Sequence, residues 1–456
     1  MKNEKSLETF NTMSVPQAVI KNAVPAMIAM LMVLVYNLAD TFFIGQTHNA
    51  YQVAAVSLAT PVFLMFMAVG TVFGIGGTSV ISRAMGEEKE QYAKKICSFC
   101  MWACVIVGIT MTFLFLLFMD NILLLIGASD DTWEFAQSYL IIVSCSGIFV
   151  LISNCYSNIL RAEGQATKAM TGQIIGNLLN VVLDPVMILG FGWNITGAAI
   201  ATVIGNVAAA GYYIIYFLRG KSSLSISIKD FSIKDKICSS VLAIGIPASL
   251  ASVLMSISQM IMNGMMAGYG DMAIAGIGVA MKVTMITGMI AMGIGQGIQP
   301  LLGYCVGAKT WERYKEIMRF SMWFAFFLGL IMTIFCYLFT NQIVSVFLTD
   351  ESAFDYAVRF ARILLTTSTL FGVFYVLTNA LQAMGAAAAS LIINLSRQGI
   401  IYIPALFVLR STLGVTGLVW AQPVADVLSI GLAVILYNIT FRKMRSSMKQ
   451  QINLTT

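Results

Sequence analysis

The chain has 456 residues, of which 58% are hydrophobic and only 11% are charged. A soluble domain carries about 25% charged residues, so this composition excludes a soluble globular protein. Long apolar runs predict membrane-spanning helices and exclude an outer-membrane barrel, whose strands would alternate over about ten residues. We therefore expect an all-α integral membrane protein.

Twelve apolar stretches are long enough to cross a bilayer as helices, which takes about 20 residues. They lie at residues 17–44, 53–84, 95–119, 136–160, 168–190, 197–218, 238–266, 273–304, 316–340, 355–383, 388–409 and 415–440. The longer ones are expected to tilt, kink or project beyond the bilayer. The first residues are polar and lack the apolar region of a cleavable signal peptide, so the first span is expected to direct insertion.

The basic residues fall almost entirely on one side of these spans. Of the 27 Lys and Arg residues, 22 lie in the two termini and in the loops after spans two, four, six and eight. The opposite loops are nearly free of them, with Arg359, Arg362 and Arg410 as exceptions near those ends. By the positive-inside rule both termini face the cytoplasm. Topology thus explains the net charge of +6, and no nucleic-acid partner is expected.

The two halves of the chain repeat each other. MGEEKEQYAKKI after span two resembles VGAKTWERYKEI after span eight, and Gly86 and Gly307 are 221 residues apart. Six spans return the chain to its starting side, so the repeats are parallel. We expect two pseudo-symmetric six-helix lobes, 1–218 and 238–456, joined by a basic cytoplasmic linker, 219–237. Transporters of this kind bind substrate between their lobes, whereas the alternative is a static bundle of duplicated ancestry.

Only three of the 21 acidic residues are embedded in spans, namely Asp40, Asp184 and Asp426. An ionised aspartate at the bilayer centre costs roughly 2.5–3.5 kcal/mol, so each is a functional hypothesis. Tyr36 and Asn37 lie one turn before Asp40. The alternative is that Asp40 lies near the helix end and reaches interfacial water.

Span five carries a polar stripe. Gln173, Asn177, Asn180 and Asp184 follow spacings of four, three and four, which place them on one helix face. Such a stripe faces the bundle interior or water rather than lipid. Pro185 follows directly and frees a backbone carbonyl one turn earlier, which becomes available as a ligand or hinge.

Neighbouring spans add Asn154 on span four and Thr202 on span six. Carboxylates, amides, a hydroxyl and freed carbonyls form an all-oxygen site that suits Na⁺, a hard cation. A proton also suits it, because two close carboxylates resist double ionisation. The alternative is a hydrogen-bonded knot that only holds spans one, five and six together.

The second half has a different polar set, with Gln259, Lys282, Arg397 and Asp426. A pair of Asp426 with Arg397 or Lys282 would lower the cost of burial, and the alternative to such structural pairing is a role in transport. The 29 methionines are suited to an adaptable pocket for apolar ligands, although each singly is more often core or lipid-facing.

Cys97, Cys100 and Cys104 share a helix face, but no second ligand cluster accompanies them. Small buried residues are therefore favoured over a zinc site. The sequence shows no nucleophile–base pair either, so we do not expect an enzyme.

Over essentially its whole length the chain resembles the multidrug and toxic compound extrusion (MATE) family, and within it the bacterial MepA-like subgroup. The resemblance is carried by NLADTFFIG in span one, GIGGTSVISRAMGEE and GIGQGIQPLLGYCVGAK at the ends of spans two and eight, LRAEGQ after span four, and NVVLDPVMI in span five. It implies export of organic cations driven by an inward flow of Na⁺ or H⁺.

In members of the family that couple in the first lobe, the positions that match are Asp40, Asn180, Asp184 and Thr202. The resemblance implies that these residues bind the coupling ion, with a possible Na⁺ site there. The residues expected to support this site or line the substrate cleft are Tyr36, Asn37, Asn154, Asn177, Gln259 and Lys282. Another branch of the family keeps coupling acids on spans seven and ten, and neither span has one here, so no second cation site is expected.

We thus expect a secondary active transporter with rocker-switch alternating access and no cofactor besides the coupling ion. Its partners would be cationic or amphiphilic drugs and the lipid bilayer, and it would be a monomer in a bacterial cytoplasmic membrane. The alternative is a lipid-linked oligosaccharide flippase of the related fold, which would need a more cationic cleft than Lys282 and Arg397 provide. A channel or receptor is a third class, and the lack of a large soluble domain weighs against a receptor.

Overall fold

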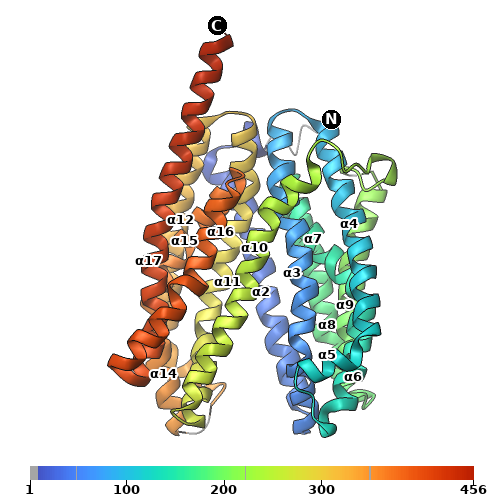
Figure 1. Ribbon diagram of the computed structural model, residues 1–456, viewed down its shortest axis with the longest axis vertical. Coiled ribbons are helices and arrows are strands. Elements are labelled where there is room, and N and C mark those ends of the chain that lie inside the picture. The colour runs from blue at the N-terminus through green and yellow to red at the C-terminus, as the bar shows by residue number, and fades with distance from the viewer. Residues whose placement is uncertain (1–8, 48, 221, 349–350, 456) are drawn as a thin grey trace. The chain divides into compact units, whose positions relative to one another are not determined.

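The computed structural model describes residues 9–47, 49–220, 222–348 and 351–455, and these residues form helices and no strands. Lys2, Lys5 and Lys221, which belong to the predicted cytoplasmic charges, lie outside these ranges. Figure 1 shows the helices, whose bounds are α2 Val15–Gly45, α3 Ala50–Gly86, α4 Glu90–Leu117, α5 Met119–Leu125, α6 Asp130–Cys145, α7 Gly147–Ala162, α8 Ala166–Pro185, η1 Val186–Gly190, α9 Asn194–Leu218, η2 Ile228–Asp230, α10 Ile237–Ala267, α11 Asp271–Gly307, α12 Trp311–Leu338, α13 Thr340–Ser345, α14 Glu351–Leu365, α15 Ser368–Ala383, α16 Ala387–Leu395, η3 Ser396–Ile400 and α17 Tyr402–Thr455.

The described helices account for all twelve predicted spans. Nine are long and apolar enough to cross a membrane, and two further spans are bent pairs, α6–α7 by 54° and α14–α15 by 47°. One of the nine, residues 387–446, joins two spans at Gly414, whose φ of 61° is a left-handed conformation that glycine adopts without strain. The predicted fold class, an all-α multi-pass membrane protein, is confirmed.

Two segments that the sequence predicts to be loops contain short helices. These are α5 and α13, which follow spans three and nine. Each has an apolar residue that is fully buried, Leu123 in α5 and Val344 in α13. Burying these side chains holds the segments against the bundle, where a helix satisfies their backbone polar groups.

Large apolar side chains are exposed on the outer faces of long helices. On α4, Ile106, Ile109 and Phe113 are each more than half exposed, at 56%, 53% and 63%. A water-soluble monomer rarely exposes a contiguous apolar face of this kind. The surface therefore matches a bilayer, whose hydrocarbon covers it.

The chain forms two compact units. The N-unit comprises Met1–Met13 and Ile28–Gly245, and the C-unit comprises Ser14–Met27 and Ile246–Thr456. The changes of unit at residues 27–28 and 245–246 fall inside α2 and α10, close to a proline in each helix, Pro25 and Pro247. The linker that the repeat predicted at 219–237 packs as part of the N-unit.

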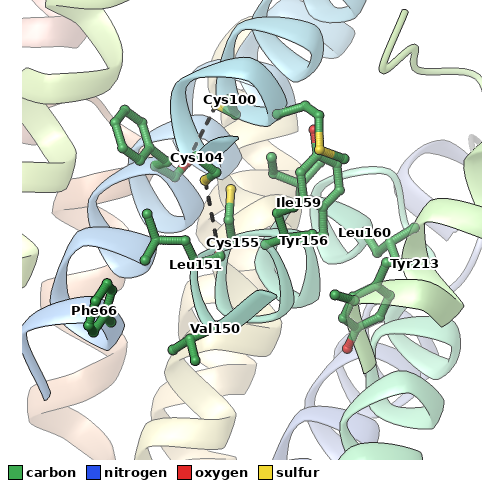
Figure 2. Packing of buried hydrophobic residues seen from close by; sticks show 14 of the residues in the cluster. Phe66, Cys100, Cys104, Val150, Leu151, Cys155, Tyr156, Ile159, Leu160 and Tyr213 are labelled. Carbon is green, nitrogen blue, oxygen red and sulfur yellow. Dashed lines mark hydrogen bonds between the residues drawn. The ribbon is translucent and has the colours of Figure 1, made fainter. Parts of the chain in front are cut away.

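The core of the N-unit lies between α3, α4, α6, α7 and α9. Figure 2 shows its sulfur-rich part, where the thiol of Cys100 donates to the carbonyl of Phe73 at 3.6 Å and that of Cys104 to the carbonyl of Leu151 at 4.0 Å. Cys155 of α7 is buried beside them. These thiols fill space between helices as small buried side chains.

The linker lies against the N-unit through apolar and polar contacts. The Ser98 hydroxyl of α4 donates to the carbonyl of Ser227 at 2.7 Å, and the rings of Phe99 and Phe231 stack with centroids 6.2 Å apart. Leu224 is buried in the same core. The linker is therefore a packed strap over one end of this unit.

Two charged residues that the sequence analysis assigned to loops are in fact buried. Arg161 lies in the last turn of α7 and is only 1% exposed, with Nη1 donating to Asn158 at 3.0 Å. Glu163 follows the same helix and is 2% exposed. Its carboxylate accepts from the hydroxyls of Ser222 and Ser223 in the linker at 2.8 and 3.0 Å. The strap thus contacts Glu163 directly, which local composition does not reveal.

Candidate functional site

Two glycines bring the backbones of α8 and α9 close together in the N-unit. A Cβ atom on Gly176 would lie 2.8 Å from the carbonyl oxygen of Gly205, and one on Gly205 would lie 2.7 Å from that of Gly176. Either distance is too short for a real Cβ contact. Small residues permit this close approach of membrane helices. The crossing brings the next polar residues of the two helices within reach of each other.

Beyond that crossing, the amide of Asn180 on α8 donates to the hydroxyl of Thr202 on α9 at 3.2 Å. Asp184 lies one turn further along α8. Asn180, Asp184 and Thr202 are 2%, 0% and 4% exposed. Three of the four predicted coupling residues therefore lie in one buried cluster.

Helix α2 adds the fourth of the predicted coupling residues, Asp40, which is half-buried. Tyr36, one turn earlier, lies beside Thr202 and within electrostatic range of both Asp40 and Asp184. The electrostatic interaction of Asp40 with Asp184 places the two carboxylates near each other. Tyr36, Asp40 and the α8–α9 cluster thus form one site within the N-unit.

Sequence reasoning missed one member of this site, Tyr139. It comes from α6, is buried, and lies within electrostatic range of Asp40, Asp184 and Tyr36. A tyrosine in a membrane span is common at the interface, so its identity alone carries no signal. Only the packing of α6 against α9 brings its phenol to the carboxylates.

Several polar atoms of this cluster are buried without a hydrogen-bond partner among the described residues. The unpartnered acceptors are Oδ1 of Asp40, Oδ1 of Asn180 and both carboxylate oxygens of Asp184. An unsatisfied buried acceptor costs about 1–3 kcal/mol, and more when it is charged. A hard cation or a proton would satisfy these oxygens, so the residues present fit either coupling ion.

The stripe on α8 divides between two clusters. Gln173 accepts from Nη2 of Arg161 at 3.1 Å and so belongs to the buried arginine rather than to the carboxylates. Asn177 lies between the two groups, and its Nδ2 has no partner among the described residues. The even spacing in the sequence therefore does not reveal that Gln173 and Asn180 have different partners.

The other predicted supporting residues have partners of their own. The Asn37 amide is exposed and donates to the Val33 carbonyl of its own helix at 2.9 Å. Asn154 accepts from the Thr71 hydroxyl at 3.3 Å. In the C-unit, the Gln259 amide lies 3.4 Å from the sulfur of Met281, and the Lys282 ammonium lies 5.0 Å from the centre of the Phe347 ring. The hydrogen bonds of Asn37 and Asn154 are thus made to Val33 and Thr71, which lie outside the carboxylate cluster.

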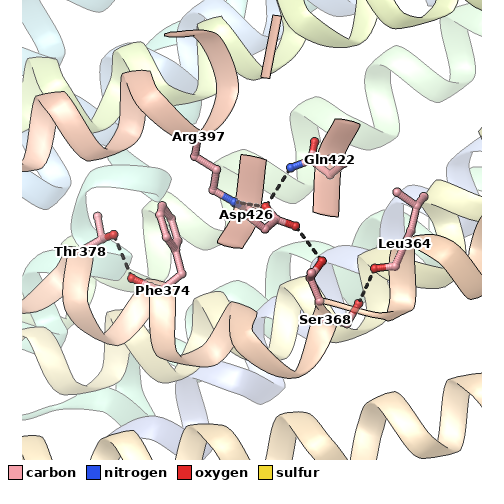
Figure 3. A network of polar contacts seen from close by, with 8 residues as sticks. Leu364, Ser368, Phe374, Thr378, Arg397, Gln422 and Asp426 are labelled. Atoms are coloured by element: carbon pink, nitrogen blue, oxygen red, sulfur yellow. Dashed lines mark hydrogen bonds and ion pairs between the residues drawn. The ribbon is translucent and has the colours of Figure 1, made fainter. Parts of the chain in front are cut away.

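The buried acid of the C-unit is fully partnered. Figure 3 shows Asp426 accepting from Nε of Arg397 at 2.8 Å and from the Gln422 amide at 2.9 Å through Oδ1. Its Oδ2 accepts from the Thr367 hydroxyl at 3.0 Å. The predicted Arg397–Asp426 pair is confirmed.

Aromatic rings complete the surroundings of that pair. The Arg397 guanidinium lies 4.9 and 4.8 Å from the ring centres of Phe371 and Phe374. Thr367 stands at the bend between α14 and α15, so the network holds this broken span to η3 and α17. Its groups satisfy one another and leave no acceptor of Asp426 open.

Comparison with known proteins gives a consistent result. The MatE family model matches residues 25–186 and 247–408, one segment in each half. The multidrug export protein MepA of Staphylococcus aureus is 31% identical over 426 residues, covering 93% of this chain and 94% of that protein. MepA of Staphylococcus saprophyticus is 30% identical with the same coverage.

Solved structures share the fold. A MATE crystal structure in complex with MaL6 has a TM-score of 0.91 at 24% identity, covering 98% of this chain and 99% of that one. A transporter of the MOP superfamily from Pyrococcus furiosus, described as having a binding pocket of reverse polarity, has a TM-score of 0.89 at 24% identity, covering 97% and 98%.

Proposed function

Because this chain belongs to the multidrug and toxic compound extrusion family, we propose that it is a secondary active transporter that exports organic cations. In this proposal an inward flow of Na⁺ or H⁺ drives export, and the protein lies in a bacterial cytoplasmic membrane with both termini in the cytoplasm. The staphylococcal relatives are named as multidrug export proteins, which supports the substrate class. They lend no support to the flippase alternative.

The observation that carries ion coupling is the set of unpartnered buried oxygens on Asp40, Asn180 and Asp184. Thr202 and Tyr36 add hydroxyl groups beside them. In a polar cluster that only holds helices together, each buried acceptor would be expected to have a hydrogen-bond donor, as Asp426 has in the C-unit. Open acceptors in a buried cluster instead favour a site that takes up and releases a cation.

The proposed mechanism follows from that exchange. An ion that enters the cluster neutralises the carboxylates and alters the packing of α2 against α8 and α9. Ion binding can drive transport only through a difference in affinity between the outward-facing and inward-facing states. We propose that the ion favours the state that releases drug, and that its departure to the cytoplasm restores the state that binds drug.

The test uses purified protein in proteoliposomes with an imposed Na⁺ gradient or pH gradient, one at a time. The gradient that drives uptake of ethidium-like cations into inverted vesicles identifies the coupling ion. The Asp40→Asn variant should lose gradient-driven transport while still folding. Asp120→Asn, which changes an exposed carboxylate on α5, serves as the matched control. Full transport by Asp40→Asn would refute coupling at this site.

A further inference from the structure

Three arginines remain outside the function proposed above. Arg359, Arg362 and Arg410 lie near the ends of spans opposite to the basic loops, where the positive-inside rule disfavours them. All three side chains are exposed. Arg359 and Arg362 are three residues apart on α14, so they project from the same face of that helix. Two neighbouring positive charges on one helix face favour the binding of an anionic ligand.

Both of these α14 arginines line one cavity of about 610 Å³ in the C-unit. Its walls come from α13, α14 and α17, and its other lining residues with polar groups are Asn341, Asp355, Thr416 and Trp420. Two arginines against one carboxylate leave the cavity with a net positive charge.

Neither arginine is neutralised by the protein. Within the described ranges, no ion pair involves Arg359 or Arg362. Arg359 Nη2 donates to the Thr416 hydroxyl at 2.9 Å, and the Arg362 guanidinium lies 5.5 Å from the centre of the Tyr337 ring. Since a guanidinium has about five N–H donors, both retain donors for a ligand.

A second cavity, of about 210 Å³, adjoins the first at Arg362, which lines both. Its lining is mainly apolar and includes Ile334, Tyr337, Leu338 and Leu365. Ile334 and Leu338 are 49% and 68% exposed, as expected of side chains that face lipid tails. A cationic site thus adjoins an apolar groove on the surface of α12 and α14.

We propose that α12, α13, α14 and α17 form a binding site for an anionic phospholipid. The phosphodiester lies between Arg359 and Arg362, because guanidinium groups bind phosphate oxygens through paired, charge-assisted hydrogen bonds. One acyl chain of the lipid follows the apolar groove. Trp420 lies at the level of the lipid headgroups, where indole rings are enriched. A headgroup with a net negative charge matches the net positive cavity.

Such a lipid would reinforce the contact between α14 and α17, whose apolar side chains already pack in one core. Helix α14 ends just before Thr367, and α17 carries Asp426, to which Thr367 donates. A phospholipid across α14 and α17 would therefore restrain the outer half of the broken span. We expect it to stabilise the C-unit against heat as well as to bind.

The test is native mass spectrometry of the full-length, delipidated protein titrated with phosphatidylglycerol. The Arg359→Gln/Arg362→Gln variant should bind the first phosphatidylglycerol about tenfold more weakly than the wild type, the loss of one or two charge-assisted hydrogen bonds. Arg410→Gln is the matched control, since that arginine is also exposed and lies over a tyrosine, Tyr269, at 5.7 Å. It should bind lipid as the wild type does.

Further measurements distinguish an anionic phospholipid from a zwitterionic one and from free phosphate. Phosphatidylglycerol should raise the melting temperature of the wild type more than phosphatidylethanolamine or inorganic phosphate does. If inorganic phosphate stabilises equally, or if both phospholipids bind equally, the anionic-lipid assignment is overturned. Arg359→Lys/Arg362→Lys keeps both charges and should retain part of the binding, which guards against misfolding of the glutamine variant. Unchanged binding by a folded glutamine variant also overturns the proposal.

Discussion

Asp184 in the N-unit and Asp426 in the C-unit are equally buried, yet their carboxylates have opposite hydrogen-bonding environments. Both oxygens of Asp184 lack a partner among the described residues, whereas Asp426 accepts from Arg397, Gln422 and Thr367. A saturated buried pair specifies packing, but it has no acceptor left for an exchanging ion. The two halves thus each contain a buried acid, but they surround it in opposite ways.

The largest expected effect comes from removing the open acid. Asp184→Asn should abolish gradient-driven export, since it takes away the charge and an acceptor of the proposed ion site. Its melting temperature should stay at or above that of the wild type, because an unpartnered buried carboxylate destabilises the fold. Proteoliposome transport and scanning fluorimetry on the same preparation measure both. If Asp184→Asn melted at a lower temperature than the wild type and kept full transport, Asp184 would be a structural residue and no part of the ion site.

The saturated acid should behave in the opposite way. Arg397→Met leaves Asp426 buried without its cation, and removing one partner of a buried pair costs about 3–5 kcal/mol. We expect a lower melting temperature and lower yield, with transport per folded molecule largely retained. The double variant Arg397→Met/Asp426→Leu should recover much of the stability, because it leaves no unpaired charge. Loss of ion-driven transport in a stable double variant would instead assign the pair to coupling.

The smallest effect concerns the linker, which packs as part of the N-unit. Burial raises the pKa of the Glu163 carboxyl above its ordinary value of 4.5. The contribution of Glu163 to the stability of the docked linker is therefore complete below pH 4.5 and is lost as the pH rises through the raised pKa. Hydrogen exchange of linker amides, corrected for intrinsic rates, should show protection that falls with rising pH in this window.

Glu163→Gln provides the control for that measurement, because its side chain does not titrate. Its linker should keep constant protection over the same pH range. Residue 384, at the repeat offset of 221 from Glu163, is a methionine, so the second half has no acid at the matching position. Parallel pH profiles for the wild type and the variant would show that Glu163 does not control docking.

The sequence by itself determined the membrane class, the positions of the spans and the existence of two repeated halves. It also singled out Asp40, Asp184 and Asp426, because the cost of placing charge in a bilayer depends on local composition alone. The repeat spacing and the charge of the loops are likewise one-dimensional properties of the chain, so they can be read without coordinates.

Partnership between side chains was decided only by tertiary structure. Helix rotation and close crossings, such as that of Gly176 and Gly205, assign Gln173 to Arg161 and Asn180 to Thr202, although all the α8 residues share one face in the sequence. The same packing adds Tyr139 and leaves the oxygens of Asp184 open. Hydrogen bonds form over about 3 Å, a scale at which the sequence pattern of one helix says nothing about its neighbours.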